Sequence, residues 1–285
     1  MATFYNQATL AYNGNTVTSN ITTGQILETL TATKSALGGE YAPGTPITYV
    51  VSLVNSGTTA FNDLTVTDNL GAYQFNTNTV RPLTYVANSA QDYVNGAKQA
   101  DPTASAAGGD LVFSNINVPA GGNATLLYQA TPNAFAPSDT DDTIVNTVTA
   151  NGAGLTEAVT ATETVTAVSE PVLTINKSLS PTTVAENGQV TYTFTILNSG
   201  NTEADAGTAA VITAPFTPPL TNLTVTFTGA PWSANTEYTY SDATGAFATT
   251  AGQLIVPAAT YRQNPTTGAW TTEPGVATLV VTGTI

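Results

Sequence analysis

The sequence contains no cysteine and no histidine, and only 8% of its residues are charged. Without cysteine, disulfides and thiol chemistry are excluded. Without histidine, imidazole acid–base catalysis and the usual zinc sites are excluded as well. No apolar run reaches the length of a membrane span, and residues 1–25 lack the charged start and apolar centre of a signal peptide. We therefore expect no enzyme activity beyond self-modification, no cofactor and no bound metal.

Basic residues are also scarce, since five lysines and arginines face 19 acidic residues and give a formal net charge of −14. Nucleic-acid binding needs clustered basic side chains to replace counterions, and docking on anionic lipid needs them too. We therefore expect neither a nucleic-acid partner nor a membrane partner. The acidic stretch Asp139-Thr-Asp-Asp142 lacks the spaced ligands of a calcium loop, so it is predicted to be a solvated loop.

The residues that are abundant favour extended structure. Hydrophobic residues make up 41% of the 285 positions, which is enough for the cores of two domains. Threonine and valine favour strands, and the 23 glycines and 16 prolines supply turns. No long stretch shows the apolar spacing of a helix, so the predicted fold class is all-β.

An internal repeat divides the chain. Leu30-Thr-Ala-Thr-Lys-Ser35 matches Leu173-Thr-Ile-Asn-Lys-Ser178, and each is followed by an alternating run that ends in Asn-Ser-Gly, at Gly57 and at Gly200. Short alternating strands with regular turns are typical of immunoglobulin-like sandwiches. We predict two tandem β-sandwich domains, one over residues 30–170 and one over residues 171–285.

The first repeat continues into a closing segment that the second repeat does not contain before Ile285. The closing segment includes Asn146-Thr-Val-Thr-Ala-Asn-Gly152, which resembles Asn6-Gln-Ala-Thr-Leu-Ala-Tyr-Asn-Gly14 at the other end of the chain. Asn-Gly is a strong hairpin signal, so we predict strands over residues 6–12 and 15–27 with a turn between them. Residues 1–29 are thus predicted to be a donor segment in which Ala8, Leu10 and Tyr12 share one face.

A sandwich without its last strands exposes an unpaired edge and an open core. We therefore expect the N-terminal hairpin of one molecule to complete the second domain of the next. Such a contact joins two different surfaces, so repetition gives an open head-to-tail filament. The expected partner is the protein itself, with an anchoring protein as a further partner.

Other interpretations stay open at this point. The N-terminal segment could be an ordinary edge hairpin of the first domain or a disordered arm, since termini are often loose. It could also fold back onto the second domain of its own chain, because tethering raises its effective concentration. A different function, that of a surface adhesin or binding module presenting loops to a ligand, is the alternative to a filament subunit.

The first repeat resembles the DUF11 family of bacterial and archaeal surface repeats. The resemblance is carried by Lys34-Ser35, Asn55-Ser-Gly57, Val66-Thr-Asp68, Pro119-Ala-Gly-Gly122 and Asn146-Thr-Val-Thr149. It implies immunoglobulin-like stalk or fibre modules, often with an internal Lys–Asn isopeptide bond. It also implies an extracellular place on a cell or spore surface, because subunits of endospore appendages are similar. The second repeat departs from the family pattern, since Ala214 stands where the aspartate is expected.

Strand alternation adds chemistry to this resemblance. Leu30, Ala32 and Lys34 share one face of a strand, so Lys34 is predicted to point into the sandwich, as is its counterpart Lys177. Burial disfavours the charged form of a lysine and leaves a nucleophilic amine. The alternative is that both lysines extend their ammonium groups into solvent from strand ends, and that Asp68 is only a turn residue.

A neutral amine, a carboxamide and a protonated acid are the components of amide exchange. We predict that Lys34 attacks the side-chain carbonyl of Asn146, that Asp68 acts as the acid, and that ammonia leaves. The equivalent bond at the second repeat would join Lys177 to Asn6 of another molecule. Each bond would form once, so this is maturation and not turnover.

Overall fold

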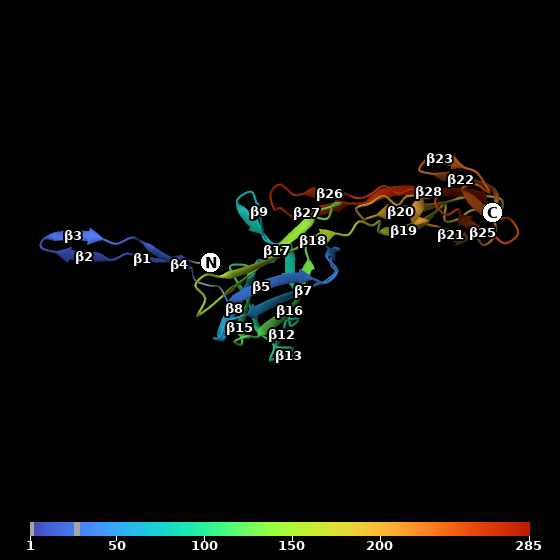
Figure 1. Cartoon of the computed structure of the whole chain (residues 1–285). Helices are drawn as coiled ribbons and strands as arrows, with labels where there is room; N and C mark the ends of the chain where they lie inside the picture. The colour runs from blue at the N-terminus through green and yellow to red at the C-terminus, as the bar shows by residue number, and fades with distance from the viewer. Residues whose placement is uncertain (1–2, 26–28) are drawn as a thin grey trace. The chain divides into compact units, whose positions relative to one another are not determined.

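The computed structural model describes residues 3–25 and 29–285, which form β-strands and one short 3-10 turn, η1 (Ala206–Thr208). This confirms the predicted all-β class. The chain has two compact units, the first made of residues 1–137 and 143–166 and the second of residues 138–142 and 167–285 (Figure 1). In the part of the chain that the structure describes, no helix is long and apolar enough to cross a membrane.

The first unit is a sandwich of two six-stranded antiparallel sheets. The first sheet has the order β13 (Ala97–Lys98), β12 (Gln91–Val94), β16 (Asn123–Pro132), β7 (Ile47–Asn55) and β5 (Leu30–Ala36), with β11 (Leu83–Tyr85) also on β16. The second has the order β14 (Thr103–Ala107), β15 (Asp110–Val118), β8 (Phe61–Asp68), β17 (Thr143–Asn151), β18 (Val159–Ala167) and β6 (Glu40–Tyr41). A small ribbon, β9 (Tyr73–Phe75) with β10 (Asn78–Val80), stands apart from both.

The core of the first unit lies between these sheets because both alternate buried and accessible residues. On β7 every second residue from Ile47 to Asn55 is buried, and β16 shows the same period of two. Rings from opposite sheets meet, as Phe113 and Tyr128 do at 5.0 Å between centroids. This alternation is the pattern that a strand with one covered face requires.

The N-terminal hairpin, residues 3–25, forms two short ladders of its own. β1 (Thr3–Asn6) pairs with β4 (Thr22–Gln25), and β2 (Thr9–Tyr12) pairs with β3 (Asn15–Thr18). Asn13 and Gly14 both have positive φ, as the predicted hairpin turn requires. The strand predicted over residues 6–12 is interrupted after Asn6. The end of the strand predicted over residues 15–27, at residues 26–27, lies outside the described residues.

The interruption of the hairpin has a local cause at Ser19. The Ser19 hydroxyl accepts a hydrogen bond from the backbone N–H of Ala8, at 2.9 Å. The Gln7 side chain donates to the Ser19 carbonyl, at 2.8 Å. These side-chain bonds replace part of the regular ladder between the two short ribbons.

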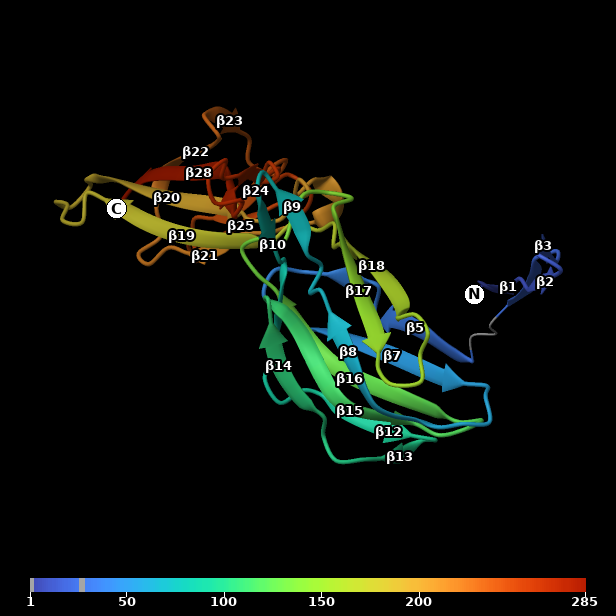
Figure 2. The same ribbon diagram turned by 90° about the vertical axis from the view of Figure 1, so that its left-hand side faces the viewer.

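The second unit has a larger and a smaller sheet (Figure 2). The larger sheet has the order β19 (Leu173–Ser180), β20 (Gln189–Asn198), β28 (Gly275–Thr284), β22 (Thr221–Phe227) and β23 (Ala230–Trp232). The smaller has the order β21 (Thr213–Pro215), β25 (Ala246–Thr249) and β24 (Tyr238–Ser241), and β26 (Thr260–Gln263) pairs with β27 (Trp270–Glu273).

The two units differ beside one strand. In the first unit β8 pairs with β15 on one side and with β17 on the other. The matching strand of the second unit, β21, pairs with β25 alone among the described strands. The second unit therefore has a free strand edge where the first has β17 and β18.

The uncovered edge changes the exposure of the neighbouring sheet. In β5 the inner-face residues Leu30 and Lys34 are 1% and 6% exposed. In β19 the inner-face residues Ile175 and Leu179, which correspond to Ala32 and Ala36, are 51% and 36% exposed, and Lys177, the counterpart of Lys34, is exposed as well. The inner face of β19 is thus apolar and open to solvent, which is unusual for a sandwich strand.

Candidate functional site

A cluster of polar side chains lies at the centre of the first sandwich. Lys34 comes from β5, Asp68 from the end of β8 and Asn146 from β17, and all three are buried. Val148 pairs directly with Asp68, which places Asn146 two residues further along the same face of β17. Strand alternation thus brings together the three residues that the sequence predicts for amide exchange.

Asp68 is the hub of this cluster. The Nζ atom of Lys34 lies 2.6 Å from its Oδ2 atom, with both side chains fully buried. The Tyr128 hydroxyl donates to the same Oδ2, and the backbone N–H of Leu70 donates to Oδ1 at 2.6 Å. Three donors fix the carboxyl group, so its orientation toward Lys34 is set by the fold.

Asn146 is held by only one end of its amide. Its Oδ1 atom accepts from the backbone N–H of Gly71 at 3.2 Å, while its Nδ2 atom has no hydrogen-bond partner among the described residues. Gly71 has φ +70°, and a Cβ there would come within 2.6 Å of Ile144. Glycine is therefore needed for this donor to reach the amide.

The turn after β8 locks this arrangement. The Oδ1 atom of Asn69 accepts from the backbone N–H groups of both Gly71 and Thr147, each at 3.0 Å. One side chain thus joins the turn to β17. This contact holds the Gly71 donor in register with Asn146.

Aromatic rings cover the cluster. Tyr49 and Tyr128 stack with 5.6 Å between ring centroids, and Lys34 Nζ lies 4.7 Å from the Tyr49 centroid. Burial raises the pKa of both tyrosines, so they stay protonated. Neither tyrosine was predicted from the sequence to belong to the cluster, although the alternation of β7 and β16 places both on the inner face.

Burial lowers the pKa of Lys34 from 10.5 to about 8, and the nearby Asp68 carboxylate only partly reverses this shift. The lowered pKa makes the neutral amine accessible near physiological pH. In this respect Lys34 has the property of an activated nucleophile.

The lowered pKa predicts how stability depends on pH when Lys34 stays a free amine. In Asn146→Ala, which offers no amide to attack, Lys34 has a pKa of about 8 when folded and near 10.5 when unfolded. Between these values only the unfolded chain binds the proton, so the free energy of unfolding should rise with pH, by roughly 3 kcal/mol in total. Urea unfolding at a series of pH values measures this free energy. The double variant Asn146→Ala/Lys34→Met lacks the amine and is the control, so an equal rise with pH in both variants would contradict the prediction.

The second lysine has a different environment. Lys177 faces the inner side of β19, with its Nζ atom 4.6 Å from the ring centroid of Tyr192 and 5.2 Å from that of Phe216. It is nevertheless exposed, because nothing in the described second unit covers β19 at this point. Ala214 occupies the position that corresponds to Asp68, so an acid is absent from this place.

The remaining predicted residues lie in the N-terminal hairpin. Leu10 is 62% exposed and Tyr12 is 52% exposed, and Ala8 and Asn6 are exposed as well. Leu10 pairs across the ladder with Val17, so one face of β2 and β3 is apolar and accessible. Asn6 belongs to the first unit and Lys177 to the second.

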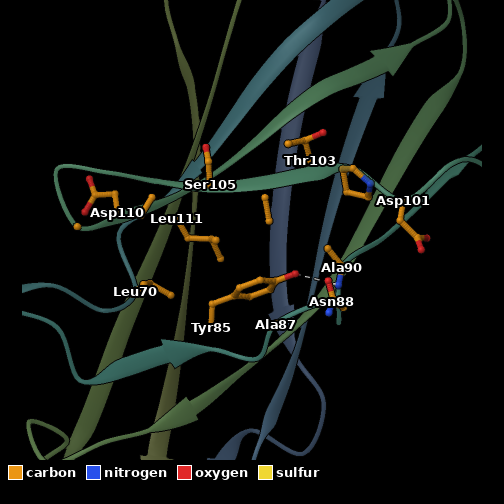
Figure 3. Close-up of a pocket in the computed structure, with 14 residues that line it drawn as sticks. Leu70, Tyr85, Ala87, Asn88, Ala90, Asp101, Thr103, Ser105, Asp110 and Leu111 are labelled. Atoms are coloured by element: carbon orange, nitrogen blue, oxygen red, sulfur yellow. Dashed lines mark hydrogen bonds between the residues drawn. The ribbon is translucent and has the colours of Figure 1, made fainter.

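A groove at the open edge of the first sandwich was not predicted from the sequence. Its larger cavity, of about 550 Å³, lies between β14 and the segment that follows β11 (Figure 3). Tyr85, Leu70 and Leu111 supply its apolar wall. Residues 139–142, the acidic stretch, do not line this cavity. No group of three potential metal-ligating side chains occurs among the residues described.

Comparisons with known proteins give distant likenesses. No protein-family model matches the chain. No curated protein matches it either. The chain is similar to the major pilin subunit BcpA of Bacillus cereus, with 10% identity over 96% of this chain and 73% of the pilin and a TM-score of 0.37. It is similar to a C-terminal fragment of the major pilin GBS80 of Streptococcus agalactiae, with 9% identity over 52% of this chain and a TM-score of 0.35.

The match spans only 58% of the GBS80 fragment. A third likeness is to the collagen-binding domain of a Staphylococcus aureus adhesin, with 12% identity over 50% of this chain and 99% of that domain and a TM-score of 0.31. Likenesses this distant carry no argument about function. The resemblance to DUF11 repeats stays a prediction.

Proposed function

We propose that this chain is a structural subunit of an extracellular filament on a cell or spore surface. Subunits join head to tail when the N-terminal hairpin of one pairs with the free edge of β21 in the next. The observation that carries the proposal is the complementarity within one chain. The hairpin has an exposed apolar face, and the second unit has an uncovered apolar face where the first has β17 and β18.

The repeat sets the register of the proposed contact. Asn6 corresponds to Asn146 and Ala8 to Val148, so Ala8 would lie opposite Ala214, as Val148 lies opposite Asp68. Leu10 would then face the sandwich interior together with Ala8. An isolated two-stranded hairpin is marginally stable in water, so pairing with β21 would stabilise the hairpin.

The proposed contact is favourable in magnitude. Leu10, Tyr12 and Val17 are each about half exposed or more, and full burial contributes roughly 1.5–3 kcal/mol for each large apolar side chain. Main-chain hydrogen bonds to β21 would be added to this. The contact joins unlike surfaces, so it extends into an open filament with an anchoring protein at its base.

We further propose that an amide between Lys34 and Asn146 reinforces each subunit. A proton moves from Lys34 to Asp68 along their 2.6 Å hydrogen bond, and the free amine attacks the side-chain carbon of Asn146. The Gly71 N–H stabilises charge on Oδ1. The unpartnered Nδ2 takes a proton from Asp68 and leaves as ammonia, and the Asp68 carboxylate then takes the second proton from the Lys34 nitrogen. The products are a neutral amide, free ammonia and a protonated Asp68, so atoms and charge balance without an oxidant.

A bond between Lys177 and Asn6 of the next subunit would extend this chemistry to the joint. Ala214 supplies no acid there, so such a bond would have to form without the group that Asp68 provides. The strand pairing does not depend on it. Intact filaments that dissociate in denaturant would indicate pairing without this bond.

Deletion of residues 3–25 tests the proposed joint directly. The shortened chain should fold but remain monomeric in sedimentation and electron microscopy at concentrations at which the full chain forms filaments. Among the described strands, the deleted β1–β4 pair only with one another, so both sandwiches stay intact and circular dichroism should keep its β signature. Filaments formed as readily without the hairpin would refute the proposed contact, and so would a full chain that stays monomeric at every concentration.

A further inference from the structure

A groove lies at the open edge of the first sandwich, and one of its lining residues, Leu70, also donates its backbone N–H to Asp68 in the Lys34 cluster. It consists of the 550 Å³ cavity beside Tyr85 and an adjoining cavity of about 400 Å³ beside Asp92. The two share Asp101, Pro102 and Thr103. Each has the size of a small-ligand site, and together they suit an elongated ligand.

The first end of the groove is apolar and aromatic. The Tyr85 ring packs edge-on against Phe113, with 6.0 Å between centroids, and its hydroxyl accepts from the Ala90 N–H at 3.2 Å. The small residues Ala104 and Ala106 of β14 also line this cavity. This end provides a fixed ring beside an open space.

The second end is polar and contains an unsatisfied group. Asp92 is 4% exposed, and its Oδ1 atom has no hydrogen-bond partner among the described residues. Burial raises the pKa of its carboxyl group, and the Tyr93 backbone N–H offsets this only in part. Native structures rarely leave such a group unpaired, and each exception calls for an explanation.

The strand opposite Asp92 is distorted. β15 shifts register against β8 between Phe113 and Ile116, and Asn115 there has φ +66°. The bulge places Asn115 and Asn117 in the lining of the second cavity. β-Bulges often re-aim side chains next to binding sites.

These features narrow the class of ligand. An anion would be repelled by Asp92 and Asp101. The groove lacks the ligands of a metal site. Asp101 already pairs with Lys98 at 3.4 Å, and the described residues contain no group of three potential metal-ligating side chains. A molecule that offers hydrogen-bond donors and an apolar ring face fits both ends.

We propose that this groove binds a neutral sugar chain, with one ring against Tyr85 and a hydroxyl group donating to Asp92. The Asn115 side chain binds a further hydroxyl group, while the Asn117 amide, which accepts from the Asp63 N–H and donates to the Asn115 carbonyl, holds this part of the groove in place. An unsatisfied buried acceptor destabilises the free protein. A ligand hydroxyl group that donates to Asp92 would satisfy this acceptor and remove the cost. The site is independent of the hairpin contact proposed above.

A glycan microarray probed with the full chain tests the site. The protein should bind at least one neutral oligosaccharide, and Asp92→Leu and Tyr85→Ala should each weaken that binding about tenfold or more, the loss expected for one hydrogen bond to a charged group or one stacked ring. Glu157→Gln, which changes an exposed carboxylate outside the groove in the same unit, should bind like the parent.

Thermal unfolding separates this role from a structural one. Because the buried Asp92 Oδ1 atom lacks a hydrogen-bond partner among the described residues, Asp92→Leu should melt about 2–4 °C higher than the parent while it loses sugar binding. A lower melting temperature would mean that Asp92 stabilises the fold and would overturn the proposal. So would an array with no bound glycan, equal binding by Asp92→Leu, or binding that is abolished by a chelator or competed by a lysine-rich peptide.

Discussion

Lys34→Met should have the full mass calculated from its sequence, whereas the parent protein should be lighter by one ammonia. The same substitution should lower the melting temperature of the first unit by roughly 10–20 °C. The proposed bond closes a loop of about one hundred residues, and a cross-link of that length stabilises by about 4–5 kcal/mol in the chain-entropy model. For a unit of this size each kcal/mol corresponds to about 2–4 °C. Mass spectrometry and calorimetry measure the two effects.

The matched control is Lys98→Met, because Lys98 is half exposed and forms only a surface ion pair with Asp101. It should keep both the ammonia loss and the melting temperature. Asp68→Ala should behave like Lys34→Met, since the amine then lacks its acid. A parent protein with its full sequence mass, or a Lys34–Asn146 cross-linked peptide recovered from Asp68→Ala, would contradict the proposed chemistry.

Leu10→Asp should prevent polymerisation. Leu10 lies on the apolar face of the hairpin, and placing a carboxylate in the proposed contact removes roughly 1.5–3 kcal/mol of burial and adds the desolvation of a charge. The dissociation constant of the joint should rise at least about 100-fold. Analytical ultracentrifugation across a concentration series measures it.

Ala11→Asp is the matched control, because residue 11 points to the opposite face of the same strand and its aspartate would remain in solvent. A synthetic peptide of residues 3–25 should also shorten filaments of the parent by occupying the β21 edge, and the same peptide with Leu10→Asp should not. Equal polymerisation by Leu10→Asp and Ala11→Asp would show that the apolar face of the hairpin is not the contact.

Strand alternation explains how much of the site the sequence could predict. A period of two places Lys34 on the face that carries Leu30, and the same rule places Asn146 with Val148. Alternation predicts which face a residue is on but not whether that face is covered. For this reason alternation alone could not predict that Lys177 would be solvent-accessible while Lys34 is buried.

Other features depend on contacts between distant strands. The hydrogen bond from Tyr128 to Asp68 joins opposite sheets, and the bulge beside Asp92 is a matter of register between β15 and β8. Neither has a local signature in the sequence. The Asn13-Gly14 turn does, because positive φ at two adjacent residues is a local requirement, and it was predicted correctly.

The position of the Lys34–Asn146 cluster also matters when the molecule is pulled. Lys34 lies on the strand that follows the N-terminal hairpin, and Asn146 lies on β17, whose partner β18 leads into the second unit. If the two side chains are covalently joined, tension entering through the hairpin crosses from β5 to β17 through that single link. Residues 35–145 then carry no load, so a stretched subunit would extend only by residues outside this loop.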